Sequence, residues 1–126
     1  MDKQDESVLK IRDVSKIYKA KGAFFGSSGK DVTALNRISF DIYKGEIFGL
    51  VGESGSGKTT AGRLIVGLEE ANSGEILMGG REIIGLRGRA QKEFRRKVQM
   101  IFQDPYQSLN PQRSIYDTVS EPLKIH

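Results

Sequence analysis

Residues 52–60 read GESGSGKTT, a glycine-rich run that ends in a lysine and two threonines. The run fits the pattern G-x-x-x-x-G-K-[ST] without a gap. Its three glycines can take positive φ and carry no Cβ, so several backbone N–H groups can converge on an anion. Lys58 would reach the β- and γ-phosphates of a nucleotide, and the Thr59 hydroxyl would bind Mg²⁺. The predicted chemistry is therefore the binding of a triphosphate together with its metal ion.

The segments on either side decide whether this run is a phosphate loop or an ordinary flexible turn. Residues 47–51, IFGLV, form a short apolar run, and residues 58–68 have helical character with Leu64, Ile65 and Leu68 on one face. A helix that starts at the loop adds the positive end of its dipole to the same place. Glycine and serine between two elements are typical of any turn. The lysine, the hydroxyl, the strand and the helix together favour a phosphate loop.

The rest of the chain alternates between strand-like and helix-like segments. Residues 8–18 and 32–42 alternate apolar and polar side chains, as half-buried strands do. Residues 46–51 and 98–102 are predicted to be buried strands, and residues 85–97 a helix. Gly79 and Gly80 separate two apolar runs and predict a β-hairpin. Ser114 is predicted to cap a helix that runs to Ser120 and ends before Pro122.

Length and composition limit the class of protein. The chain has 126 residues, which suits one domain, and 37% of them are hydrophobic. No apolar run approaches the roughly 18 residues of a membrane span. The first ten residues, MDKQDESVLK, lack the apolar stretch of a secretory signal, so a cytoplasmic location is expected. There is no cysteine, which excludes a disulfide scaffold and a thiol nucleophile.

The net charge of +4 raises the question of nucleic-acid binding. The densest basic stretch is residues 81–97, which also include Glu82 and Glu93 and a single aromatic residue, Phe94. Proteins that bind single strands interleave aromatic side chains with the basic ones, and this stretch does not. A solvated helix face is the expected interpretation, with a partner-facing basic surface as the alternative. No nucleic-acid partner is expected.

Two polar residues outside the run are also candidates for ligand contacts. Tyr18 ends the first predicted strand, where an aromatic residue on its own is typical of packing at a core or rim. Gln103 follows a predicted strand and opens a loop, QDPYQSLNP, that two prolines punctuate. The ligand crevice of such sheets lies beyond the carboxyl ends of the strands. A glutamine there can offer oxygen to Mg²⁺ and nitrogen to phosphate, although taken alone it could simply cap the loop.

The combination of these motifs resembles the ATP-binding subunits of ABC transporters. It rests on Tyr18, GESGSGKTT, the hairpin SGEILMGG and the run VQMIFQDPYQSLNP. The last run, followed by EPL, is most similar to the oligopeptide and dipeptide importer branch. The resemblance extends from about Val8 to the end of the chain. It implies an α/β fold, a P-loop NTPase core with an antiparallel β-subdomain, and residues 1–126 would then be a partial nucleotide-binding domain.

The resemblance assigns roles residue by residue. Tyr18 would stack on adenine. Gln103 would be the glutamine that touches Mg²⁺ and the attacking water, and Lys58 and Gln103 would be the catalytic contributions of this chain. Thr59 and Gln103 would be the metal ligands. The nucleotide would be held by the whole of the run: Gly52, Glu53, Ser54, Gly55, Ser56, Gly57, Lys58, Thr59 and Thr60.

The resemblance also implies partners and a membrane role. ATP and Mg²⁺ would be the cofactors, and the chain would act with transmembrane permease subunits and a second ATP-binding subunit, on the inner face of the cell membrane. The expected function is ATP binding that energises import of peptides or related solutes. Two alternatives remain open: a fragment that binds nucleotide without turnover, and an ABC-type NTPase unrelated to transport.

The 126 residues contain no LSGGQ-type signature and no apolar run ending in Asp-Glu. The family uses both to hydrolyse ATP, so the complete subunit is expected to be an ATPase and this chain alone is expected not to turn over ATP. The strand that carries the Asp-Glu pair lies beside the phosphate-loop strand in the family. Residues 47–51 are therefore expected to present an unpaired apolar edge, and the isolated chain is expected to associate or be poorly soluble.

Overall fold

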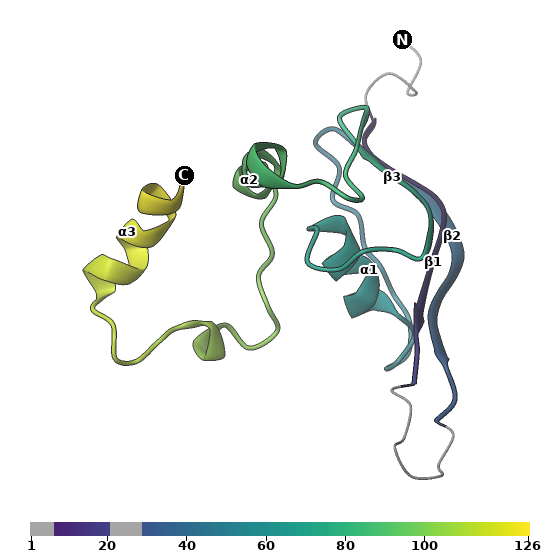
Figure 1. The fold of residues 1–126 in the computed structure, drawn as a ribbon, viewed down its shortest axis with the longest axis horizontal. Coiled ribbons are helices and arrows are strands. Elements are labelled where there is room, and N and C mark those ends of the chain that lie inside the picture. Colours follow the sequence, from purple (N-terminus) through teal and green to yellow (C-terminus); the bar gives the residue numbers. More distant parts are fainter. Residues whose placement is uncertain (1–6, 21–28) are drawn as a thin grey trace. The chain divides into compact units, whose positions relative to one another are not determined.

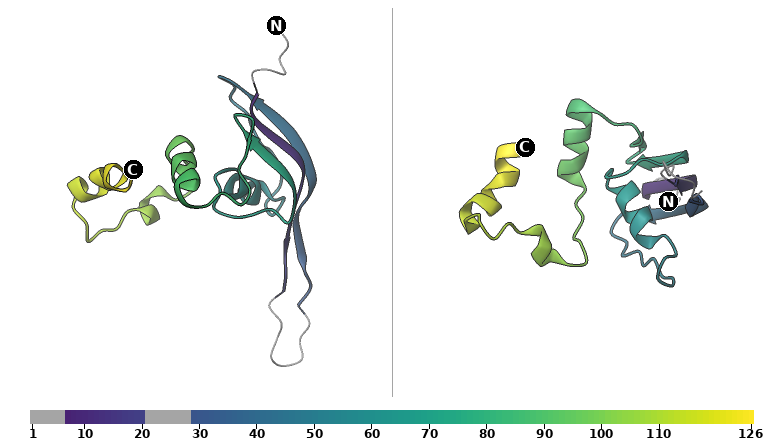
Figure 2. Two further views of the ribbon diagram at one scale, coloured as in Figure 1. Left: turned by 45° about the horizontal axis from the view of Figure 1, so that its top comes forward. Right: turned by 60° about the horizontal axis from the view of Figure 1, so that its bottom comes forward.

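The computed structural model describes residues 7–20 and 29–126, which fall into two units, residues up to Leu86 and residues from Arg87. Figures 1 and 2 show the first unit as a curved antiparallel sheet with one helix against a face of it. Phe24 and Phe25 stand next to each other in a glycine-rich stretch, and such a pair is expected to fold back on the domain or to meet a partner; both lie outside the described ranges.

The sheet of the first unit has four strands in the order β2-β1-β3-β4. β1 (Ser7–Tyr18) pairs antiparallel with β2 (Val32–Tyr43) on one side and with β3 (Ser73–Met78) on the other. β4 (Arg81–Glu82) pairs with β3. The two long strands confirm the prediction from alternating side chains. β1 lies in the middle and carries three buried side chains of the core: Leu9, Ile11 and Val14.

The turn between β3 and β4 follows directly from its two glycines. Gly79 and Gly80 have φ of 55° and 76°, and two successive positive φ values are what a type I′ hairpin turn requires. Met78 pairs with Arg81 across the turn. The predicted hairpin is therefore confirmed, although its second strand is Arg81–Glu82 rather than the apolar residues that follow.

β1 and β2 bulge at facing positions. Asp13 and Arg37 have φ of 47° and 48°, in the left-handed region that side chains rarely adopt. The Asp13 N–H donates to the Ser39 hydroxyl at 2.8 Å, and the Arg37 N–H donates to the Ser15 hydroxyl at 3.0 Å. Each serine hydroxyl thus accepts a hydrogen bond from a backbone N–H that the bulge takes out of the pairing between the strands. Bulges increase local twist, and the long hairpin curves accordingly (Figure 1).

Helix α1 (Lys58–Ile65) covers one face of the sheet (Figure 2). Its buried residues, Ala61 and Leu64, are one helical turn apart and join the buried side chains of the strands. The predicted helix is confirmed, and it ends a few residues earlier than expected. Gly67 has φ of 67°, a left-handed conformation that stops a helix.

The second unit contains two α-helices and a short 3₁₀ turn: α2 (Gly88–Lys97), η2 (Pro105–Ser108) and α3 (Ile115–Ile125). The Asp117 N–H donates to the Ser114 hydroxyl at 3.1 Å, which confirms the predicted cap. The predicted end of this helix is wrong, because α3 continues through Pro122. A proline removes one backbone N–H from the ladder, and here the next turn still closes, with His126 N–H donating to the Pro122 carbonyl at 3.0 Å.

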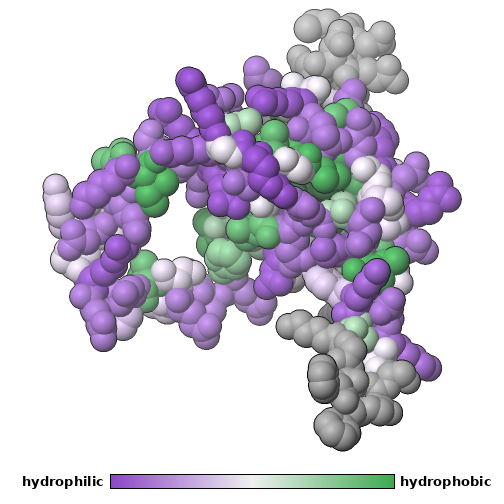
Figure 3. Space-filling view, in the orientation of Figure 1, coloured by the Kyte–Doolittle hydropathy of each residue, from purple (hydrophilic) through white to green (hydrophobic). Residues whose placement is uncertain are grey.

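Two predicted strands do not form. Residues 46–51 and 98–102 are irregular, and Ile47, Val51 and Ile101 are 99%, 95% and 88% exposed. A strand exists only when a neighbour completes its hydrogen bonds, and among the described residues neither segment has one. The expected unpaired apolar segment before the loop is thus observed as irregular chain. Apolar side chains reach the surface in several separate patches (Figure 3).

The stretch before the loop is held at one point by an aromatic pair. The Phe48 ring stacks on Phe40 of β2, with centroids 4.9 Å apart and planes 8° from parallel. Offset-stacked rings add to the free energy of apolar burial. No helix within the described ranges has the length and apolar character needed to cross a membrane.

Candidate functional site

Lys58 lies inside the loop that precedes α1. Its ammonium group donates to the carbonyl oxygens of Gly52 and Glu53, both at 2.6 Å, and to the Ser56 hydroxyl at 3.0 Å. An ammonium group has three N–H donors, so these contacts account for all of them. The loop therefore wraps around a positive charge, and an anion that reaches Lys58 would exchange with one or more of these oxygens.

Two glycines leave room that a side chain would fill. A Cβ on Gly52 would lie 2.6 Å from the Ser56 hydroxyl oxygen and 3.8 Å from Lys58 Nζ, inside the concave side of the loop. Gly57 has φ of 92° and caps α1, where a Cβ would lie 2.3 Å from the Ala34 carbonyl oxygen. Glycine at 52 thus keeps the cradle open, and glycine at 57 lets the helix start against β2.

The first turn of α1 supplies donors and a hydroxyl at the same place. The Ala61 N–H is the first to bond back into the turn, to the Gly57 carbonyl at 2.9 Å, which leaves the amides of residues 58–60 without intrahelical acceptors. Thr59 is exposed on this turn. Hard oxygen ligands together with phosphate oxygens suit Mg²⁺, so the residues present fit a Mg·nucleotide. Within the described ranges, no three acidic, histidine or cysteine residues gather into a metal site.

Tyr18 lies at the end of β1 beside residues that follow α1. Its hydroxyl donates to Glu69 Oε2 at 2.5 Å, and Lys16 Nζ lies 5.3 Å from the centre of its ring. Glu69 also binds Arg63 of α1 at 3.3 Å. Tyr18 keeps 38% of its surface exposed. The predicted base contact therefore sits in a network that includes the helix of the phosphate loop.

The hydrogen bond between Tyr18 and Glu69 shifts the pKa values of both residues. The hydrogen bond from Tyr18 is the main reason that the pKa of Glu69 is lowered, and the charges of Arg63 and Lys16 add to it. The same bond raises the pKa of the Tyr18 phenol, against an opposing hydrogen bond with Thr60. Glu69 is thus held ionised and Tyr18 neutral at physiological pH.

The contribution of Glu69 and Lys16 was not anticipated from the sequence. Glu69 lies in a turn after α1 and matches no motif, and its partner Tyr18 is far away along the chain. Lys16 sits two residues before Tyr18 on the same face of β1. This spacing could have indicated the contact, because a lysine next to an exposed aromatic residue on a strand can cover the aromatic ring.

Gln103 belongs to the second unit, in an exposed stretch between α2 and η2. Asp104 caps η2 by accepting from the Tyr106 N–H at 3.2 Å. The phosphate loop, Tyr18 and Thr60 all lie in the first unit, where the structure brings them to α1 and its ends. The contact of Gln103 with metal and nucleotide stays a prediction.

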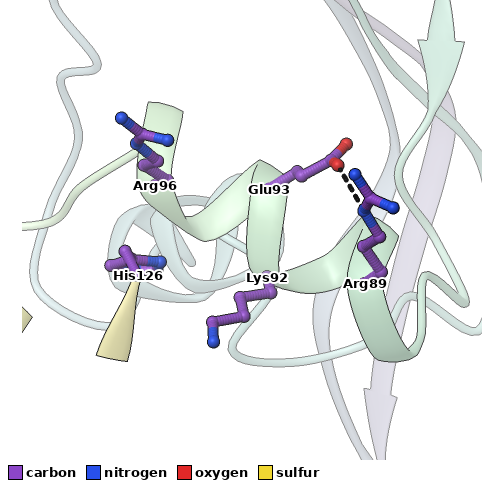
Figure 4. Close-up of a pocket in the computed structure, with 5 residues that line it drawn as sticks. All are labelled: Arg89, Lys92, Glu93, Arg96 and His126. Carbon is purple, nitrogen blue, oxygen red and sulfur yellow. Dashed lines mark hydrogen bonds and ion pairs between the residues drawn. The ribbon is translucent and has the colours of Figure 1, made fainter. Parts of the chain in front are cut away.

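The second unit has a basic pocket of its own, with a volume of about 350 Å³. It is lined by α2 and the end of α3: Arg89, Lys92, Glu93, Arg96 and His126. Figure 4 shows Glu93 turned toward Arg89, with which it forms an ion pair of 3.1 Å. None of the predicted nucleotide contacts lines this pocket. Its basic residues Arg89, Lys92 and Arg96 are exposed, and the choice between a solvated face and a partner-facing surface stays a prediction.

Comparison with known proteins agrees with the motif analysis. Residues 35–124 match the model of the ABC transporter family. The chain is 41% identical over 117 residues to the oligopeptide transport ATP-binding protein OppF of Lactococcus lactis subsp. lactis (strain IL1403), covering 93% of this chain and 37% of that protein. It is 55% identical over 96 residues to OppF of Bacillus subtilis (strain 168), covering 75% and 32%.

A third relative carries another cargo name. The chain is 40% identical over 121 residues to the glutathione import ATP-binding protein GsiA of Escherichia coli (strain K12), covering 96% of this chain and 19% of that one. The chain therefore spans between 19% and 37% of the length of these relatives.

The fold has solved counterparts. One is a dimeric ATP-binding cassette in a post-hydrolysis state bound to ADP and Pi, with a TM-score of 0.76 and 27% identity, covering 92% of this chain and 47% of the other. A second, a dimeric bacterial ABC transporter cassette, matches with the same TM-score and identity. The α/β architecture with an antiparallel β-subdomain is that of these cassettes.

Proposed function

Because this chain belongs to the ABC transporter family, we propose that its residues 52–60 bind ATP with Mg²⁺ and that it serves as the nucleotide-binding part of an importer ATPase. The observation that carries the proposal is the position of Lys58, whose ammonium group is enclosed by the loop that Gly52, Glu53 and Ser56 form. A fixed positive charge, convergent amides and a helix N-terminus together favour a phosphate chain over other ligands.

The bound nucleotide would use the following contacts. Lys58 and the loop amides would hold the phosphates, Thr59 would bind Mg²⁺, and Thr60 would contact the α-phosphate. Tyr18 offers its ring to the adenine. Gln103 would contribute a ligand to Mg²⁺ and would contact the attacking water. The metal ion, when bound, would supply positive charge beside the phosphates that transfer.

The cargo and the assembly are proposed from the relatives. Two are named for oligopeptide transport and one for glutathione import. We propose a peptide or a related small solute as cargo, transmembrane permease subunits and a second ATP-binding subunit as partners, and a peripheral location on the inner face of the cell membrane. For these 126 residues the proposed activity is binding, while hydrolysis is proposed for the assembly that acts in transport.

Equilibrium binding of Mg·ATP tests the proposal. Lys58→Ala should weaken binding by at least about tenfold, which corresponds to about 1.4 kcal/mol. Lys92→Ala removes an exposed lysine of α2 and should leave binding unchanged. Chelation of Mg²⁺ should weaken binding to the unaltered chain. Equal affinity of the Lys58→Ala variant and the unaltered chain would contradict the proposed function.

A further inference from the structure

We propose that Glu69 is a positioning residue for the nucleotide base: it fixes the ring of Tyr18 relative to α1 and so sets the platform on which adenine stacks. The inference rests on the proposed function, in which Tyr18 contacts the base. Glu69 itself would not touch the nucleotide. It lies after α1, outside the predicted phosphate loop.

Both carboxylate oxygens of Glu69 have partners from different elements. Oε2 accepts the Tyr18 hydroxyl at 2.5 Å, and Oε1 accepts an Arg63 N–H at 3.3 Å. The side chain of Glu69 is 22% exposed in this arrangement. Charge-assisted hydrogen bonds are short and strong compared with neutral ones. Glu69 thus ties the last residue of β1 to the last turn of α1.

Lys16 fixes the ring from a second direction. Its ammonium group lies 5.3 Å from the centre of the Tyr18 ring and donates to the Glu70 carbonyl oxygen at 2.7 Å. It also lies 3.8 Å from Glu69 Oε2. A cation on one face of an aromatic ring is attracted by the ring and occupies that face. A base can therefore stack only on the other face of Tyr18.

The network connects the base contact to the phosphate contacts through one helix. Arg63 and Thr60 both belong to α1, which begins at Lys58. Thr60 opposes the rise in the pKa of the Tyr18 phenol. Helix α1 is short and rigid, so it sets the distance from the Tyr18 ring to the phosphate loop. Without Glu69, the Tyr18 side chain regains rotamer freedom, which binding must then remove.

The test compares Mg·ATP with Mg·tripolyphosphate, which has the phosphates but no base. Glu69→Ala and Tyr18→Phe should each weaken ATP binding about three- to tenfold, as expected for one side chain that must be ordered on binding. Neither should change the affinity for tripolyphosphate. Glu69→Gln keeps an acceptor oxygen and should restore part of the loss. The double variant, Glu69→Ala with Tyr18→Phe, should bind ATP no more weakly than the weaker-binding single variant. Each single substitution already removes the hydrogen bond between Tyr18 and Glu69.

A readout that needs no nucleotide follows the phenol of Tyr18. In protein labelled at the tyrosine ring carbons, the Tyr18 resonance is assigned with Tyr18→Phe and titrated by NMR. Glu69 raises the pKa of this phenol, so Glu69→Ala should lower its titration midpoint. A midpoint that does not change with Glu69→Ala would overturn the inference.

The outcomes separate this inference from the proposed function. If Tyr18→Ala leaves ATP binding unchanged, the base contact itself is contradicted. If Tyr18→Ala weakens ATP binding and Glu69→Ala does not, the base contact stands and the positioning role is overturned. If Glu69→Ala weakens ATP and tripolyphosphate equally, Glu69 acts on the fold as a whole and the inference is again overturned.

Discussion

Gly57 meets Ala34 so closely that a Cβ on the glycine would lie 2.3 Å from the alanine carbonyl oxygen. This contact sets the helix of the phosphate loop against β2. Gly57 also has φ of 92°, where side chains are strained. The position therefore demands glycine for two independent reasons.

We predict that Gly57→Ala destabilises the fold by about 2–4 kcal/mol, from backbone strain of about 1–2 kcal/mol and overpacking of similar size. Gly55 is the matched control, since its φ is 81° and nothing lies within 4 Å of its added Cβ. Gly55→Ala should therefore cost about 1–2 kcal/mol, from strain alone. Urea unfolding measures the free energy of unfolding of both variants and of the unaltered chain. Equal losses would show that the contact with Ala34 does not matter.

Gly52→Ala should impair binding rather than folding. Its Cβ would approach the Ser56 hydroxyl oxygen and Lys58 Nζ, the groups that form the inner side of the loop. We expect the affinity for Mg·ATP to fall by about tenfold or more. Gly49→Ala is the control, because nothing lies within 4 Å of a Cβ there, and it should bind as the unaltered chain does. Unchanged affinity in Gly52→Ala would contradict the cradle assigned here.

The pair Arg12–Asp41 should make stability depend on acid pH. Two parallel hydrogen bonds join the guanidinium of β1 to the carboxylate of β2, the second at 2.8 Å, and Arg12 lowers the pKa of Asp41. In the unfolded chain, an aspartate binds its proton near its ordinary pKa of about 3.9. Below that pH the unfolded state holds more protons than the folded state, so stability is lost as pH falls toward the lowered pKa.

Urea unfolding midpoints measured at pH 7 and pH 3 test whether acid lowers the stability of the fold. The unaltered chain should lose more stability between the two than Asp41→Asn, whose side chain does not titrate. Other carboxylates, including Glu69, contribute equally to both proteins and drop out of the comparison. An equal loss in both proteins would refute the prediction.

The exposed apolar residues before the phosphate loop predict association. Ile47 and Val51 are 99% and 95% exposed, and exposed apolar surface favours contacts between chains. Replacing both by serine should raise the protein concentration at which light scattering detects oligomers. Lys44→Ser changes an exposed polar neighbour and should have no such effect. A wild-type chain that is monomeric, with a sharp and reversible unfolding transition, would contradict this prediction.

Local patterns predicted local structure well. The positive φ values of Gly79 and Gly80, the cap by Ser114 and the helix that begins at Lys58 each depend on a few neighbouring residues. The alternation in residues 8–18 and 32–42 likewise reports which side chains face the core. Such features are encoded within one element, so sequence periodicity is sufficient to find them.

Features that depend on distant partners were missed or misjudged. Residues 46–51 have the composition of a strand but no partner strand among the described residues, and composition does not supply the missing hydrogen bonds. Glu69 reaches Tyr18 only because α1 returns the chain to the end of β1. The loop that encloses Lys58 follows from residues at fixed spacing along the chain, and its binding of phosphate stays a prediction.

The most direct test of the central claim is to titrate ¹⁵N-labelled protein with Mg·ATP and follow the backbone amide resonances. The largest shifts should occur at the amides of residues 52–60, with a second set at Tyr18 and its neighbours, and Lys58→Ala should abolish both. Largest shifts in α2 and its basic pocket, or no shifts at saturating nucleotide, would contradict that claim.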